Sequence, residues 1–391
     1  MTRVRFSWCP ILLLMLAAPA RAEGPSASWP TTAWPESSPQ AQGLDAAALE
    51  SLHRELAEGK HGYVDDMLVV RNGAVVFERS YRHEYDRLFE GKGAPGLYNY
   101  YDPEWHPYWK RTALHTMQSV SKSVTAALVG IAIRRGEIPD VDAKVMPYFA
   151  AFKTAPDPRR DAMTLRHVLT MTTGIAWDES SVPYTDPRNN CAQMEAREDW
   201  IQYVLDQPMA EEPGRKWQYN SGATQLLSFL IKKATGREAD DYAREHLFDP
   251  LGIEYAWKRT PRGLADTEGG LYLRPRDLAK IGYLFLKDGV WEGKRILPEG
   301  WVKDSTTWHV GTSGGRRGYG YKWWVLSRRG PGTYEAYAGL GYGGQFLIVV
   351  PELDLIAVFT GWNIYDMPEL DELFALERVL AAVKDRPTPA P

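Results

Sequence analysis

The chain has 391 residues, of which 44% are hydrophobic and 25% are charged, and its formal net charge is −4. This is the balance of an ordinary globular protein, so disordered, collagen-like and coiled-coil chains are excluded. Both signs of charge are interspersed, which argues against a nucleic-acid partner, and two cysteines are too few for a disulfide scaffold or a four-cysteine zinc site.

The N-terminus predicts a secretory signal peptide over residues 1–22. Arg3 and Arg5 precede an apolar run, and an Ala-Arg-Ala sequence ends at Ala22. The run is too short to span a bilayer comfortably, which disfavours an uncleaved anchor. We therefore expect an exported protein, periplasmic or secreted, with no stable membrane span. Cleavage would leave 43 basic and 50 acidic side chains, a charge of −7, and Cys191 as the only cysteine.

The first part of the mature chain predicts a helix, a hairpin and a long loop. Helical spacing runs from Leu44 to Glu58, and two β-branched runs, 67–70 and 74–77, flank an Asn-Gly turn at Asn72. The loop from Tyr98 to Trp109 is dense in aromatic side chains. Its rings either line an apolar pocket or pack in the ordinary way, and their number alone does not separate the two.

The remainder predicts a helical middle followed by a return to strands. The expected helices are Ser119–Arg135, Leu165–Met171, Ala223–Ala234, Arg276–Leu286 and Leu370–Val383. The expected strands are Tyr319–Leu326, Tyr334–Ala338, Gln345–Val350 and Leu355–Thr360. This order indicates one α+β domain over residues 23–391, with an α/β part at about 23–140 and 262–391 and a helical part at about 141–261.

A serine and a lysine at the start of the helix from residue 119 form the first candidate catalytic pair. Ser119 and Lys122 are three residues apart, so their side chains share one helix face. A serine hydroxyl needs a neighbouring base, and a lysine with a lowered pKa can serve. The helix N-terminus also favours a nearby oxyanion. The alternative is that Ser119 caps the helix and Lys122 is solvated.

Two further segments are candidates for the same chemistry. Tyr219 lies in a loop just before an amphipathic helix, where its phenol can project into a cleft or simply pack. Glycine-rich residues 337–345 lead into a strand and permit close approach of a ligand. An N–H at the start of that strand could supply half of an oxyanion hole, or the segment could be only a turn.

Other motifs are set aside. The sequence Gly-Thr-Ser-Gly-Gly at 311–315 matches a nucleophile elbow, but neither a helix nor a later histidine follows it. His167 is expected to be structural. No tight cluster of metal-ligating residues occurs in the sequence, so neither a metal nor another cofactor is expected.

The three segments, in this order, resemble the penicillin-recognising serine hydrolases, and more specifically the class C β-lactamase-related family. That family includes DD-peptidases, lactamase-fold esterases and 6-aminohexanoate-oligomer hydrolases. The similarity covers roughly residues 40–385 and includes the segments Thr164–Gly174, Leu247–Ile253, Gly269–Lys280 and Arg295–Trp301. It implies a β-lactamase/DD-peptidase-like fold, an antiparallel sheet flanked by helices with a helical insertion.

The resemblance also implies roles for individual residues. Ser119 would be the acylated nucleophile, Lys122 its proton acceptor or relay, and Tyr219 the group that passes protons to the leaving group. The oxyanion hole would be formed by the N–H groups of Ser119 and Gln345. Tyr342-Gly343-Gly344 stands where many members have Lys-Thr-Gly or His-x-Gly.

Two departures from the lactamase pattern bear on the substrate. The lactamases have Tyr-x-Asn, whereas here Asn220 and Ser221 follow Tyr219, so that the amide-gripping Asn is replaced by Ser221. Both Asn220 and Ser221 are expected to contact the substrate. Tyr342 gives no cation to hold a lactam carboxylate, and losing such a contact costs about 10²–10³ in affinity. Efficient β-lactam hydrolysis is not expected, and the pattern is similar to the 6-aminohexanoate-oligomer hydrolase and esterase branch.

The sequence therefore predicts an exported serine hydrolase for a small ester, amide or peptide substrate. Within enzymes, the alternatives are a D-alanyl-D-alanine carboxypeptidase or transpeptidase and a weak β-lactamase. Outside enzymes, they are a sensor or binding module that is acylated once, and an envelope protein with a decayed site, against which the intact Ser119, Lys122 and Tyr219 speak. The oligomeric state stays open.

Overall fold

The computed structural model describes residues 29–94, 99–313, 315, 317–327, 334–365 and 367–385. The predicted signal peptide, residues 1–22, lies outside the described residues, as do Tyr98 and the tail from Arg386. In the part of the chain that is described, no helix combines the length and the apolar character that crossing a membrane requires.

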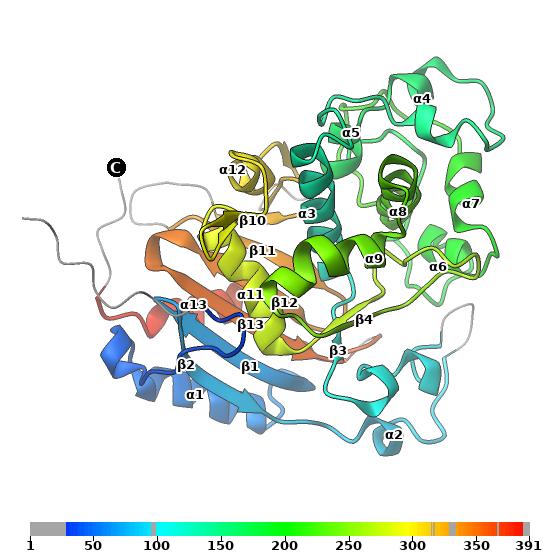
Figure 1. The fold of residues 1–391 in the computed structure, drawn as a ribbon. Helices are drawn as coiled ribbons and strands as arrows, with labels where there is room; N and C mark the ends of the chain where they lie inside the picture. The colour runs from blue at the N-terminus through cyan, green and yellow to red at the C-terminus, as the bar shows by residue number, and fades with distance from the viewer. Residues whose placement is uncertain are drawn as a thin grey trace, which may run out of the picture.

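An antiparallel sheet of eight described strands forms the centre of the fold (Figure 1), in the order β2-β1-β13-β12-β11-β10-β9-β8. The pairing of β1 with β13 joins the two ends of the chain within one sheet. The strands are β1 (Val64–Arg71), β2 (Ala74–Ser80), β8 (Val310–Gly311), β9 (Gly318–Tyr319), β10 (Trp324–Ser327), β11 (Ala336–Gly341), β12 (Gln345–Val350) and β13 (Leu355–Gly361).

The predicted hairpin is the pair β1 and β2. Asn72 and Gly73 form its turn with φ values of 51° and 76°, and Arg71 lies opposite Ala74. A two-residue turn with both φ values positive matches the twist of the flanking strands, which is why Asn-Gly is favoured there. The prediction from the sequence is confirmed.

Helices cover both faces of the sheet. On one face, α1 (Ala46–Ala57) and α13 (Glu372–Ala381) pack against alternate residues of β12 and β13, including Ile348 and Phe359. On the other, α3 (Val120–Arg134) and α11 (Pro275–Leu286) pack against the residues between them. Both strands are buried along their whole length, which explains why the sequence shows continuous apolar runs rather than alternation.

The regular elements between α3 and α11 are mainly helices, and they lie beyond one end of the sheet, on the right in Figure 1. The helices are α4 (Pro158–Ala162), α5 (Leu165–Leu169), α6 (Asn190–Glu195), α7 (Trp200–Asp206), α8 (Ser221–Thr235), α9 (Ala239–Ala243) and α10 (Asp249–Leu251). The smaller elements are α2 (Tyr85–Leu88), α12 (Trp301–Thr306), β3 (His115–Thr116), β4 (Tyr255–Trp257), β5 (Leu271–Leu273), β6 (Val290–Trp291) and β7 (Lys294–Arg295). The expected α+β class, an antiparallel sheet flanked by helices, is confirmed.

The single strand expected over Tyr319–Leu326 is wrong. β9 ends at Tyr319 and β10 begins only at Trp324, because the chain between them turns into the core. Lys322 has a φ of 62° and donates its N–H to the carbonyl oxygen of Leu169 at 3.0 Å. A Cβ on Gly320 would lie 2.0 Å from the carbonyl oxygen of Ser305, so this approach requires glycine. The aromatic run of the sequence reflects burial here, not an extended strand.

Candidate active site

The segment that carries Ser119 is fixed between two strands. Met117 donates its N–H to the carbonyl oxygen of Leu271 at 2.8 Å, which ties the segment to β5. On the other side a Cβ on Gly341 would lie 2.5 Å from the Met117 carbonyl oxygen, so only glycine lets β11 come this close. Gln118 has a φ of 45° in the left-handed region, a strained conformation that a side chain adopts at a cost of about 1–3 kcal/mol. The strain falls directly before Ser119.

Ser119 stands at the N-terminal end of α3, and Lys122 lies one turn further on. The Lys122 Nζ donates to the Ser119 Oγ at 2.9 Å. The Lys122 side chain is almost completely buried, whereas Ser119 is half-buried and lines a pocket. The structure therefore brings the predicted pair together, with Ser119 in the wall of a pocket.

Tyr219 comes to the same place because α8, which follows it, packs against α3. Its ring centroid lies 5.2 Å from the Lys122 Nζ, and its ring stacks on Trp324 with centroids 5.9 Å apart. Burial raises the pKa of Tyr219, against the opposing effects of Lys122 and of a hydrogen bond with Ser119. All three predicted catalytic side chains thus meet within one cluster, with Tyr219 as a neutral phenol.

Two buried glutamates that the sequence analysis missed belong to this cluster. Glu268 accepts from the Lys122 Nζ through its carbonyl oxygen at 2.7 Å and through its Oε2 at 3.0 Å. Glu179 accepts from the N–H and the hydroxyl of Ser221 at 2.9 and 2.7 Å. Burial lowers the pKa of Lys122, but Tyr219, Glu268 and Glu179 outweigh it, so the lysine pKa lies above its usual range. At rest Lys122 is therefore an ammonium ion, and the lowered pKa that the sequence analysis requires of a lysine base is not found.

The glycine-rich turn between β11 and β12 borders the pocket. Gly343 and Gly344 have φ values of 84° and 98°, which glycine alone adopts readily. Tyr342 and Gly344 line the pocket that holds Ser119, whereas Gln345 is fully buried and bonds through its carboxamide to the backbone of Gly361. No described hydrogen bond uses the backbone N–H of Ser119 or of Tyr342. The oxyanion role of the Gln345 N–H stays a prediction, and the Tyr342 N–H is a second candidate.

The side chains of Asn220 and Ser221 are occupied elsewhere. Both are 1% exposed. Asn220 caps α8 by accepting from the Ala223 N–H at 2.8 Å, and Ser221 donates to Glu179. Their predicted contact with substrate stays a prediction, while the structure gives both a part in fixing the loop that carries Tyr219.

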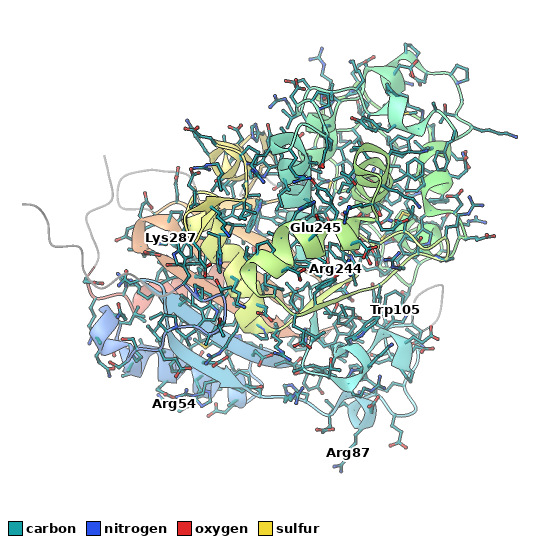
Figure 2. All side chains as sticks on the ribbon, viewed as in Figure 1. Arg54, Arg87, Trp105, Arg244, Glu245 and Lys287 are labelled. Atoms are coloured by element: carbon teal, nitrogen blue, oxygen red, sulfur yellow. The ribbon has the colours of Figure 1, made fainter. Side chains whose placement is uncertain are left out.

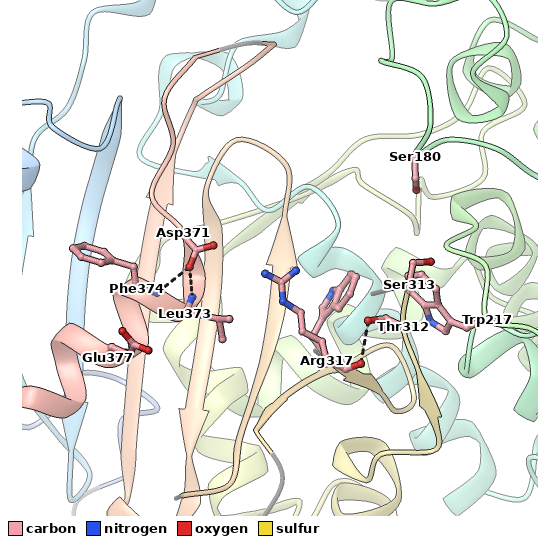
Figure 3. Close-up of a pocket in the computed structure, with 10 residues that line it drawn as sticks. Ser180, Trp217, Thr312, Ser313, Arg317, Asp371, Leu373, Phe374 and Glu377 are labelled. Carbon is pink, nitrogen blue, oxygen red and sulfur yellow. Dashed lines mark hydrogen bonds between the residues drawn. The ribbon is translucent and has the colours of Figure 1, made fainter. Parts of the chain in front are cut away.

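The pocket has a volume of about 340 Å³ and is rich in aromatic and acidic groups. It is lined by Ser119, Tyr184, Tyr219, Trp324, Leu340, Gly341, Tyr342, Gly344, Phe346, Glu369, Leu370, Asp371 and Glu372. A second pocket of about 580 Å³, whose lining is drawn in Figure 3, shares Trp324 and Asp371 with it. The only basic side chain lining either described pocket is Arg317, which forms an ion pair with Glu372.

The described part of the aromatic loop lies behind this pocket rather than in its wall. Tyr100 is 4% exposed and contacts the ring of Tyr342, with centroids 5.3 Å apart. Trp105, labelled in Figure 2, lies under the ammonium of Lys258 at 4.0 Å. The loop thus supports the Tyr342 side chain. Of the two possibilities for its rings, lining a pocket or ordinary packing, the described residues favour packing.

The remaining sequence interpretations concern histidine, the elbow-like sequence and metals. His167 accepts the Thr164 N–H through its Nδ1 at 3.1 Å at the start of α5, a structural role. After the sequence at 311–315 the next element is the strand β9, not a helix. Cys191, Glu195 and Glu268 offer ligand atoms within 4.8 Å of one another. Because Glu268 is paired with Lys122 and burial raises the pKa of Glu195, this group has little charge left for a cation.

Comparisons with known proteins bear on the family and the fold. The model of a family described as Beta-lactamase matches residues 54–363. The 6-aminohexanoate-dimer hydrolase of Paenarthrobacter ureafaciens is 25% identical over 265 residues, which are 62% of this chain and 65% of that protein. The chain thus spans just under two thirds of that relative's length.

Two solved structures share the fold over most of the chain. EstCE1, described as a hydrolase with promiscuous acyltransferase activity, has a TM-score of 0.64 at 15% identity, over 88% of this chain and 99% of that one. A family VIII carboxylesterase has a TM-score of 0.62 at 16% identity, over 86% and 95%. At these identities the likeness establishes the fold alone.

Proposed function

The chain belongs to the β-lactamase family of serine hydrolases, and on this premise we propose that it cleaves ester or amide bonds through an acyl-enzyme on Ser119. The observation that carries the proposal is the 2.9 Å hydrogen bond between the Lys122 Nζ and the Ser119 Oγ, at the edge of a pocket. A serine hydroxyl becomes a useful nucleophile only beside a group that takes its proton. The Lys122 side chain lies in that position.

The first step is attack of the Ser119 Oγ on the substrate carbonyl carbon. The hydroxyl proton moves towards Lys122 as the new C–O bond forms, and negative charge develops on the carbonyl oxygen. The Ser119 N–H at the start of α3 and one N–H of the turn at 342–345 would stabilise that charge. The lining of the pocket favours Tyr342 over Gln345 for the second donor.

The second step is departure of the alcohol or amine. Tyr219 keeps its proton because burial raises the pKa of its phenol, and its ring is held between Lys122 and Trp324. It can therefore protonate the leaving group and then accept a proton from the water that hydrolyses the acyl-enzyme.

The charges of the pocket favour neutral or cationic substrates over carboxylates. Glu369, Asp371 and Glu372 line it, and no lysine or arginine does so among the described residues. The Tyr342 hydroxyl, at the position where a cation would hold a lactam carboxylate, accepts the Tyr365 N–H at 2.7 Å instead. We infer that β-lactams are poor substrates.

We also propose that the protein is exported, with cleavage after Ala22. The support is the sequence of residues 1–22, a basic start, a short apolar run and a small-residue cleavage site.

Active-site labelling tests the proposal. A fluorophosphonate probe reacts with activated serines, so the wild-type protein is expected to label and Ser119→Ala to remain unlabelled. Ser313→Ala is the matched control, because Ser313 is the exposed serine of the elbow-like sequence, and it should label like the wild type. A wild type that does not label, or a Ser119→Ala variant that labels equally, would refute the mechanism.

A substrate panel separates the alternatives. Short p-nitrophenyl esters should turn over faster than D-Ala-D-Ala peptides and a chromogenic cephalosporin. The reverse order would identify a cell-wall peptidase or a lactamase. A single burst of p-nitrophenol without a steady rate would instead indicate a sensor that is acylated once.

A further inference from the structure

The contacts of the Lys122 ammonium raise the question of where the serine proton goes. Its three N–H donors are matched by three acceptors, the Ser119 Oγ at 2.9 Å, the Glu268 carbonyl oxygen at 2.7 Å and the Glu268 Oε2 at 3.0 Å. Lys122 is 1% exposed and Glu268 is 5% exposed, so water does not compete for these positions. An ammonium ion bound in this way has no lone pair to offer Ser119.

Lys122 can accept the Ser119 proton only if it gives up one of its own. Of its three acceptors, Ser119 is the group to be deprotonated, and a peptide carbonyl oxygen is not basic at these pH values. The Glu268 carboxylate is left as the one proton acceptor in contact with the Nζ. The lysine thus stands as a bridge between a hydroxyl and a carboxylate.

We propose that Glu268 is the base behind Lys122, so that the proton of Ser119 passes to Lys122 while a proton of Lys122 passes to Glu268. In this step the Ser119 O–H bond breaks and its C–O bond to the acyl carbon forms. One N–H bond forms on Lys122 and another breaks, and the Glu268 carboxylate becomes a carboxylic acid. One negative charge has then moved from Glu268 to the carbonyl oxygen of the substrate. The inference rests on the proposed function and deepens it.

The groups around the pair keep the proton on Lys122, and Glu268 ionised, before substrate binds. The ionisable groups that face Lys122 and Glu268 are Tyr219, Glu179, Cys191, Glu195, Lys258, Asp266 and Lys322. Although burial opposes it, Lys122 and the hydrogen bonds to the carboxylate hold the pKa of Glu268 below its usual range. Burial and the charge of Glu268 raise the pKa of Glu195 well above normal and that of Asp266 to about 7. Of Glu195, Asp266 and Glu268, only Glu268 has a lowered pKa, and it is the carboxylate that touches Lys122.

The pH dependence of kcat/KM distinguishes this relay from a lysine acting alone. With the relay, a p-nitrophenyl ester should be cleaved at a constant rate through neutral pH, and the rate should fall only where Glu268 takes up a proton in acid. With Lys122 alone, the rate should instead rise with pH into the alkaline range, because the pKa of Lys122 is raised. The wild-type profile alone can overturn the proposal, even where a variant fails to fold.

Glu268→Gln makes the test sharper, because the two mechanisms predict opposite changes. The amide keeps the shape of the side chain but accepts no proton, so we expect kcat/KM at neutral pH to fall by about 100-fold or more. The remaining rate should rise about tenfold per pH unit as Lys122 itself deprotonates. If Lys122 acts alone, removing the neighbouring charge lowers its pKa, and the neutral rate should increase. An unchanged or increased rate overturns the relay.

Two controls separate a failed relay from a failed function. Glu195→Gln makes the same acid-to-amide change on the neighbouring carboxyl that hydrogen-bonds Glu268. Because the amide N–H can still donate to the Glu268 carboxylate, this variant should keep the wild-type pH profile. A Glu195→Gln profile that changes as Glu268→Gln does would overturn the assignment to Glu268. Ser119→Ala is measured in parallel. If Ser119→Ala stays active, the proposed function itself fails; if it is inactive while Glu268→Gln behaves like the wild type, only the relay fails.

Discussion

Among single residues, Tyr219 offers the cleanest separation of chemistry from packing. Tyr219→Phe keeps the ring that stacks on Trp324 and lies over Lys122, and removes only the hydroxyl. An amine leaving group must be protonated as it departs, whereas p-nitrophenolate leaves without a proton. We therefore expect kcat/KM to fall by about 100-fold or more for an anilide and by much less for the p-nitrophenyl ester.

The ratio of the two rates is the measurement. Equal losses on both substrates would contradict the assignment of Tyr219 as the acid for the leaving group. A thermal unfolding curve close to that of the wild type serves as the control, since the substituted ring should fill the same space.

The sequence predicted Ser119, Lys122 and Tyr219 but not Glu268, and the reason is distance along the chain. Ser119 and Lys122 are one helical turn apart, so their contact follows from local spacing. Glu268 lies 146 residues from Lys122, and only the packing of β5 beside the start of α3 brings them together. In the sequence, Glu268 is marked only by the two glycines that follow it at 269–270.

At the level of elements, the buried Asp65 joins three segments near the start of the sheet. It lies on β1 and accepts hydrogen bonds from Tyr85 at 2.7 Å and from His83 and His115 at 3.0 and 3.1 Å. His115 belongs to β3, a few residues before Ser119. Although burial opposes it, these contacts hold the pKa of Asp65 well below its usual range.

Asp65→Asn is therefore expected to destabilise the protein by about 3–5 kcal/mol at neutral pH. The substitution removes the negative charge to which the buried side chains of Tyr85 and His115 donate. A group with a lowered pKa in the folded state stabilises that state above its unfolded pKa of about 3.9, and the effect is lost as the pH falls through the folded value. Urea unfolding at several pH values measures both the loss of stability and its dependence on pH. The gap between wild type and variant should narrow below about pH 4, and a gap that stays constant into acid would argue against the charge as its source.

The elements themselves were predicted where one local pattern decides them. The Asn72-Gly73 hairpin and the largely apolar, fully buried β12 and β13 follow from turn chemistry and nearly continuous hydrophobicity. The break between β9 and β10 was not predicted. Trp323 is fully buried in the connection between the two strands, and its apolar side chain would suit a buried strand equally well. Tertiary packing around Gly320 decides between strand and turn, and no local pattern records it.

At the level of the whole molecule, the fold is held by its core and by the pairing of its two ends. β1 pairs with β13, and α1 packs beside α13, so early and late segments share one cluster. Cys191 is a free cysteine and is 2% exposed. An exported form cleaved after Ala22 would keep this cysteine and lose Cys9. Such a protein has no intramolecular disulfide to support it.

Counting thiols tests two points together: cleavage of the signal peptide, and a fold that no disulfide stabilises. Protein recovered from the periplasm should begin at Glu23 and release one thiol equivalent in denaturant, whereas the uncleaved chain holds two cysteines. The native protein should react very slowly, because burial raises the pKa of the Cys191 thiol well above normal and keeps it from the reagent. Its melting temperature should be the same with and without a reducing agent. Two thiols with Met1 retained would contradict cleavage, and a melting temperature that falls on reduction would reveal an intermolecular disulfide that one chain cannot form alone.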